Sequence, residues 1–274
     1  MAVVERAGVR RHAEVAWRAT ERVGLHEAVI VVVSFLIYFA VRGMVVDRAG
    51  QAMVNAFDLI ALERKLGIYW ELEMQSWILD SYVVIKAMNW IYFWGHMPLV
   101  IVFAVWLWAR HRAAYTLTRN AFLASGAIAV VIYATYPVAP PRLVPFAGYV
   151  DTMALFDRVG YNAQEVSAFV NPFAAVPSLH FGWSLLLGAV IAKVSPSPLL
   201  KLAGVLWPIA MFFSVVMTGN HFILDAVAGA VVSFAGLGIA VALREGLRFK
   251  DSGLSERHRS AGAGPETGTP VAES

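Results

Sequence analysis

Six apolar stretches separated by short polar segments dominate the chain. They cover about residues 28–46, 87–109, 114–136, 178–194, 199–219 and 222–243. Each is close to the roughly 20 apolar residues that a helix needs to cross a bilayer. The pattern therefore predicts an all-α, polytopic membrane protein in which six transmembrane helices form a bundle.

Residues 47–85, between the first two stretches, follow a different pattern. In QAMVNAFDLIALERKLGIYW and ELEMQSWILD, apolar residues recur at helical spacing, and Glu63, Arg64 and Lys65 form one polar band. Segments of this kind are typical of helices that lie in the membrane interface. We expect interfacial helices that pack against the bundle; covering a lipid entrance is their alternative use.

Composition agrees with a membrane protein and limits its chemistry. Hydrophobic residues make up 59% of the chain and charged residues 15%, which is more apolar than a soluble domain. Cysteine is absent, which excludes disulfides, thiolate metal sites and a cysteine nucleophile. We expect no nucleic-acid partner.

The chain divides into three parts. Residues 1–27 carry arginines without a cleavage site and are expected to remain as a cytoplasmic N-terminal segment. Residues 28–246 form the six-helix membrane domain. Residues 247–274 are rich in Gly, Ser, Glu, Thr and Pro and are expected to be a disordered cytoplasmic tail.

Lysine and arginine are distributed unequally between the two sides of the predicted bundle. Fifteen of the 22 flank the side that holds both termini, although the loops of the other side are longer. This bias predicts cytoplasmic termini. The loop 137–177 and the beginnings of the helices at Ser178 and His221 then lie at the outer face of a cell membrane.

Three polar elements fall at that outer face. Arg142 follows two prolines in APPRL, Ser178 and His180 lie in PSLH, and His221 and Asp225 lie in HFILD. The last two are four residues apart and share a helix face. Taken singly, each has an ordinary use: Arg142 as a lipid-headgroup anchor, Ser178 as a helix cap, and either histidine as a packed polar residue.

Together these residue types supply the parts of a phosphoryl-transfer site. A helix N-terminus binds anions, and an arginine fork matches phosphate oxygens. A histidine oriented by a carboxylate serves as nucleophile or base, and a second histidine protonates a leaving oxygen. Ionisable groups seldom occur in membrane spans without a function, so their coincidence at one face predicts an active site.

In order and spacing, these motifs resemble those of the type-2 phosphatidic acid phosphatase superfamily over about residues 85–243. The resemblance implies an outward-facing site in which His221 becomes phosphohistidine, Asp225 orients it, and His180 protonates the leaving alkoxide. The phosphate would be bound by Arg142, by Ser178 and by backbone N–H groups of the turn at Ser178, Leu179 and His180. The resemblance implies neither metal nor cofactor.

The chain also departs from the superfamily pattern. Thr135 replaces a lysine, Leu143 a proline, Leu179 a glycine and Val215 an arginine, whereas Ser214 is kept. Two cations are therefore missing. A phosphomonoester carries nearly two negative charges and a diester one, so the loss favours a diester. With APPR and PSLH, the chain is most similar to inositol phosphorylceramide synthases and bacterial inositol-phosphotransferase-like proteins.

The leading hypothesis is a membrane lipid phosphotransferase that passes an inositol-phosphate-like group to an alcohol. A lipid phosphate phosphatase, with water as acceptor, is the alternative. A transporter or proton relay, and a zinc hydrolase using His180, His221 and Asp225, are rivals of other classes. Asn89, Tyr92 and His96 share one helix face, where they either line the substrate cavity or form hydrogen bonds between helices. The roles of Arg119 and Arg158 stay open, and each is a candidate to replace one of the two missing cations.

Overall fold

The computed structural model describes residues 24–34, 36–37, 48–156 and 173–262, with side chains described as far as residue 246. These residues are almost entirely helical. In chain order the helices are Gly24–Ser34, α2 (Ala49–Leu66), α3 (Glu71–Leu79), α4 (Tyr82–Trp90), the π-helix η2 (Ile91–Gly95), α5 (His96–Arg110), α6 (Arg112–Thr135), the 3-10 turn η3 (Pro141–Leu143), α7 (Thr152–Phe156), α9 (Leu179–Val194), α10 (Pro198–Met217) and α11 (Ile223–Gly262).

Four of the predicted spans are helices long and apolar enough to cross a membrane. They are Tyr82–Arg110, which joins α4, η2 and α5; α6; α10; and the Ile223–Gly246 part of α11. A fifth, α9, is apolar but has 16 residues. The first predicted span, 28–46, is described only in part, through the helix Gly24–Ser34. The all-α membrane fold is confirmed, with four spans observed at full length within the described residues.

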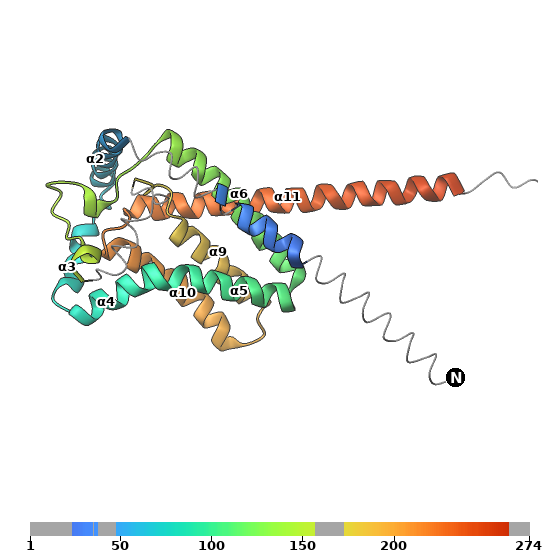
Figure 1. Cartoon of the computed structure of the whole chain (residues 1–274), viewed down its shortest axis with the longest axis horizontal. Helices are drawn as coiled ribbons and strands as arrows, with labels where there is room; N and C mark the ends of the chain where they lie inside the picture. Colours follow the sequence, from blue (N-terminus) through green and yellow to red (C-terminus); the bar gives the residue numbers. More distant parts are fainter. Residues whose placement is uncertain (1–23, 35, 38–47, 157–172, 263–274) are drawn as a thin grey trace, which may run out of the picture.

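The long helices run side by side, and α11 extends beyond them at one end (Figure 1). It continues as helix to Gly262, past residue 246, where we expected the membrane domain to end. Helices α2 and α3 lie at the opposite end of the bundle, beside the loops that join the spans (Figure 1). That end, which we call the loop end, holds the three polar elements.

Helices α2 and α3 pack against the bundle, as expected. Ala52 and Ile60 of α2 are buried with Val138 and Phe222 in one apolar cluster. Met74 and Ile78 of α3 are buried in a second cluster with Met211 and Val215 of α10. The two helices therefore close the loop end with apolar side chains.

The expected polar band on α2 is wrong in one respect. Glu63 is fully buried, whereas its neighbours Arg64 and Lys65 are exposed. Helical spacing placed three consecutive residues in one band, but consecutive residues point about 100° apart around a helix axis. Glu63 faces the bundle, and its carboxyl group needs partners there.

Glycines set the close approach of the central helices. A Cβ atom on Gly182 of α9 would overlap the carbonyl oxygen of Gly229 of α11, and one on Gly229 would overlap that of Ser178. On the other side of α9, a Cβ on Gly188 would overlap the carbonyl oxygen of Gly204 of α10. Small residues permit such contacts between membrane helices, so α9 is held tightly between α10 and α11.

The second span contains a π-helical turn beside the loop-end residues. Over η2 the regular hydrogen-bond spacing widens, and Gly95 leaves room for Trp207, whose ring atom would lie 2.8 Å from a Cβ there. Short π-helical turns are frequent at functional sites. Here Tyr92 lies within the turn and His96 directly follows it, and both side chains are buried.

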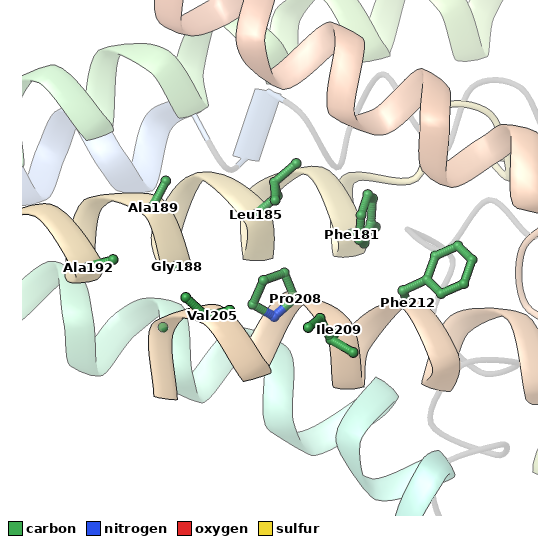
Figure 2. Close-up of a pocket in the computed structure, with 10 residues that line it drawn as sticks. Phe181, Leu185, Gly188, Ala189, Ala192, Val205, Pro208, Ile209 and Phe212 are labelled. Carbon is green, nitrogen blue, oxygen red and sulfur yellow. The ribbon is translucent and has the colours of Figure 1, made fainter. Parts of the chain in front are cut away.

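An apolar groove of about 420 Å³ runs between α9 and α10 (Figure 2). It is lined by Phe181, Leu185, Gly188, Ala189, Ala192, Gly204, Val205, Pro208, Ile209 and Phe212. None of these side chains can bind a phosphate. The groove therefore offers apolar contacts only, whereas the three polar elements lie at the loop end.

Candidate active site

Backbone hydrogen bonds join the three predicted elements at the loop end. The Arg142 N–H donates to the carbonyl oxygen of Gly219, at 2.8 Å. The Ser178 N–H donates to the carbonyl oxygen of Asp225, at 2.9 Å. Gly219 has φ 69°, a left-handed conformation that favours glycine. The APPRL turn, the beginning of α9 and the beginning of α11 are thus fixed relative to one another.

The ring of His221 is held through its Nδ1 atom. Nδ1 lies 2.9 Å from the carbonyl oxygen of Ala175 and 3.3 Å from Oδ2 of Asp225. A carbonyl oxygen can only accept, so Nδ1 must carry the proton. The Nε2 atom then has the free lone pair of the neutral ring. This is the tautomer that a nucleophilic histidine requires.

Asp225 is held as firmly as the histidine that it orients. It is fully buried, and its Oδ2 also accepts the Phe222 N–H at 2.9 Å. It therefore fixes both the ring of His221 and the backbone of the turn that precedes α11. The predicted spacing of four residues does bring the two side chains together.

His180 contacts two aromatic rings of the second span. Tyr92 stacks on it with ring centroids 4.6 Å apart, and His96 lies on it at the same centroid distance. The ring of His221 is 5.9 Å away, centroid to centroid. One phosphoryl group can contact both histidines at this separation.

This arrangement answers part of the question about the polar residues of the second span. The rings of Tyr92 and His96 contact His180. Asn89 bonds elsewhere: its Nδ2 donates to the carbonyl oxygen of Thr152, at 3.0 Å. Its Oδ1 accepts from the Thr152 hydroxyl, also at 3.0 Å. Hydrogen bonding between helices, one of the two expected uses, accounts for Asn89.

Ser178 is the N-cap residue of α9, but its side chain makes no capping hydrogen bond. Its hydroxyl group is buried and has no partner among the described residues. The expected cap is therefore wrong at the level of the side chain. The expected use of the Ser178 N–H for phosphate is also wrong, because that group donates to Asp225.

Leu179 and His180 are the first two residues of α9. Backbone N–H groups at the beginning of a helix lack partners within the helix. The Leu179 side chain is buried, at 5% exposure. The unpaired hydroxyl of Ser178 therefore lies at the beginning of a helix, where the partial positive charge of the helix favours anions.

Arg142 is already engaged by two polar side chains. Its Nε donates to Oδ1 of Asn220 at 2.9 Å, and its Nη1 donates to Oδ2 of Asp151 at 3.0 Å. The other carboxylate oxygen of Asp151 accepts the N–H groups of Met153 and Ala154 and so caps α7. The guanidinium group keeps further N–H donors, but its charge is shared with an aspartate.

Sequence reasoning missed Asp151. An aspartate before the run TMALF is a helix-cap signal, and the cap is present. Its second bond, to an arginine nine residues earlier, depends on the path of the loop. No spacing rule gives that path.

The positions of the missing cations are now visible. Val215 is fully buried in the apolar cluster with Ile85, Tyr92 and Met211. Thr135 is exposed, and its hydroxyl donates to the carbonyl oxygen of Val131 at 2.8 Å. A cation at position 215 would be surrounded by apolar side chains, so its replacement by valine is matched by the local packing.

Neither Arg119 nor Arg158 is observed at the position of a missing cation. Arg119 pairs with Glu27 and also donates to Asn120. It lies 16 residues before Thr135 along α6, so it is about 24 Å from the loop end of that helix. Arg158 lies outside the described residues.

The fold and this cluster define a class: a helical membrane protein with a carboxylate-oriented histidine, a second histidine and an arginine at one end of the bundle. The family model described as PAP2 superfamily matches residues 57–239. The chain belongs to this superfamily. It is thus a phosphatase- or phosphotransferase-type lipid enzyme, and its substrate is a phosphorylated lipid. No curated protein and no solved structure matches the chain.

Proposed function

We propose that the protein is a lipid phosphotransferase that works through a phosphohistidine at His221. The group transferred is a phospho-alcohol, of the inositol-phosphate type, taken from a phosphodiester lipid and passed to an alcohol. The observation that carries this proposal is the fixed tautomer of His221, whose Nδ1 is held by Ala175 and Asp225. That contact leaves Nε2 to attack phosphorus.

In the first half-reaction, the Nε2 lone pair of His221 forms a bond to phosphorus. The bond from phosphorus to the leaving alkoxide breaks, and imidazolium His180 gives that oxygen its proton. In the second half, the acceptor hydroxyl attacks phosphorus, His180 takes the proton of the acceptor, and the P–N bond breaks. Charge and protons balance over the cycle.

The remaining polar groups bind the phosphate oxygens. Arg142 supplies charge and N–H donors, Ser178 supplies its unpaired hydroxyl, and the N–H groups of Leu179 and His180 supply the helix terminus. Among the described residues, no three His, Asp or Glu side chains gather closely enough to hold a metal ion. This favours a metal-independent reaction over the zinc hydrolase.

The charge of the site favours a singly charged phosphodiester. Asp151 offsets the charge of Arg142, and the two cations absent at Thr135 and Val215 lower the positive charge further. A lipid phosphate phosphatase, with water as acceptor, remains the second candidate because hydrolysis and transfer share the first half-reaction.

Purified protein tests the proposal when it is given a diester lipid and the monoester of the same diacylglycerol, each with a metal chelator. We expect turnover that survives the chelator and a larger kcat/KM for the diester. Better turnover of the monoester would move the phosphatase ahead. Inactivity on every phosphate lipid would favour the alternative that the protein is a transporter or proton relay.

Asp151→Asn should shift this preference toward the monoester. The change removes one negative charge beside Arg142, while the amide oxygen can still cap α7. Removing this repulsion stabilises a bound dianion more than a bound monoanion. For a phosphate about 6 Å from position 151 near a surface, the difference corresponds to roughly a tenfold or larger change in the ratio of the monoester and diester kcat/KM values. The exposed Asp80→Asn is the matched control. Equal effects on both substrates would contradict the charge argument.

We also propose that the site faces away from the cytoplasm, on the basis of the arginine and lysine bias. Single cysteines can test this because the chain has none. Asp80 lies at the loop end and Lys193 at the opposite end of the bundle, and both are exposed. The two test variants are Asp80→Cys and Lys193→Cys. In intact cells an impermeant thiol reagent should label position 80 alone. Labelling of position 193 alone would reverse the orientation.

A further inference from the structure

Two glutamates from the interfacial helices reach the first turn of α11. The Ile223 N–H donates to Oε1 of Glu71 at 2.9 Å, and the Leu224 N–H donates to Oε1 of Glu63 at 2.8 Å. Both glutamate side chains are fully buried. They come from α3 and α2, roughly 150 residues away along the chain, and end within three residues of His221.

These bonds satisfy backbone groups that a helix cannot satisfy itself. The first N–H groups of an α-helix have no partner within the helix, and its partial positive charge favours carboxylates. Asp225 accepts the N–H of Phe222, and the two glutamates accept the next two. Three acidic side chains therefore fix consecutive residues of the turn that follows His221.

The second oxygens of the two glutamates point to a shared proton. Oε2 of Glu63 and Oε2 of Glu71 are buried and accept from no donor among the described residues. Burial, and then a hydrogen bond with the Glu71 side chain, raise the pKa of Glu63 to about 9. One proton between the carboxyl groups provides this hydrogen bond, and the pair then carries one negative charge.

We propose that Glu63 and Glu71 are positioning residues that hold the first turn of α11 through a proton-sharing carboxyl pair and thereby aim Nε2 of His221 at the substrate phosphorus. Helices α2 and α3 are then part of the active centre, in addition to packing against the bundle. The inference rests on the proposed role of His221.

Several titratable or charged groups face the pair. Asp225 lies on α11, near both carboxyl groups. Tyr149, of the loop before α7, donates a hydrogen bond to the Tyr69 hydroxyl at 3.1 Å, and burial raises the pKa of Tyr149. Arg64 lies over the ring of Tyr69. His221 completes the set. All of these groups are common to wild type and the variants below.

Glutamine and alanine variants separate positioning from mere packing. In Glu63→Gln or Glu71→Gln, the amide oxygen can still accept the helix N–H, and the amide NH₂ replaces the shared proton. We expect kcat close to wild type. Glu63→Ala and Glu71→Ala remove the acceptor, and kcat should fall about 10²-fold with little change in KM. Glu73→Gln, on the exposed face of α3, is the matched control.

Amide hydrogen exchange provides a readout that does not depend on activity. The alanine variants should exchange faster at residues 222–225 than wild type, whereas the glutamine variants should not. Wild-type exchange and wild-type kcat in the alanine variants would overturn the positioning role. Inactivity of wild type on every phosphate lipid, together with faster exchange in the alanine variants, would contradict the proposed function. It would still support the role of the two glutamates in holding the first turn of α11.

The shared proton is tested by pH. Between the ordinary pKa of 4.5 and about 9, folded Glu63 keeps a proton that the unfolded chain has lost. The free energy of unfolding therefore falls as pH rises through this window. The melting temperature in detergent should fall less steeply with pH in Glu63→Gln, and its activity should persist above pH about 9, where wild type declines. Identical pH profiles in the two proteins would contradict proton sharing.

Discussion

Replacing His221 by alanine is expected to abolish turnover and to prevent formation of any phosphorylated enzyme. The reason is that in the proposed reaction Nε2 forms the bond to phosphorus, while Nδ1 is held by the Ala175 carbonyl oxygen and the Asp225 carboxylate. The measurement is quenching in alkaline detergent after mixing with a lipid labelled in its phosphate, followed by detection of label on the protein that is stable in base and released by acid.

His111→Ala is a suitable control for this experiment. His111 lies between α5 and α6, at the end of the bundle opposite the site, and packs against Trp106. Label retained by His111→Ala and lost by His221→Ala would support the assignment. Label that persists in His221→Ala would show that another group is the nucleophile.

Loss of His180 should slow the reaction by about 10²–10⁴-fold when the leaving group is an aliphatic alcohol, since this is the usual contribution of general acid catalysis. An alkoxide is a poor leaving group without a proton, whereas an activated aryl oxide leaves readily. His180→Ala should therefore regain most of its rate of intermediate formation on an aryl phosphate ester. His221→Ala should not.

The comparison of leaving groups separates the acid from a packing residue. The ring of His180 contacts those of Tyr92 and His96, so its removal also leaves space in the site. A purely structural defect would slow all substrates alike. An equal loss on alkyl and aryl esters would assign His180 to packing. Rescue of His221→Ala instead of His180→Ala would mean that the two roles are reversed.

The fold could be predicted from the sequence because the bilayer imposes a simple rule. Every spanning segment must be apolar over its length and satisfy its own backbone, so runs such as 114–136 and 199–219 identified helices directly. The contact between His221 and Asp225 was equally accessible because the two residues are four apart in sequence, although His221 lies just before α11 and not on it. Contacts of this kind depend on local spacing alone.

The errors and omissions share a different physical origin. Glu63, Glu71 and Asp151 have partners in other elements, and those partners are backbone N–H groups or an arginine whose position depends on the packed fold. The same holds for Ser178, whose N–H is taken by a carbonyl oxygen of another helix. A sequence shows that a donor or acceptor is present, but the fold decides which group it meets.

The shortness of α9 has a consequence for the depth of the reaction. His180 and Lys193 lie near the two ends of this helix, and thirteen residues of α-helix span about 20 Å, well below the roughly 30 Å of a bilayer hydrocarbon core. With the Lys193 ammonium at one interface, His180 of the proposed site lies several ångströms beneath the opposite headgroup plane, or the bilayer thins around it. Tilting the helix increases the difference. A lipid phosphate must therefore either sink toward the acyl region or meet a thinned bilayer, and in both cases membrane thickness sets part of the energy of reaching the site.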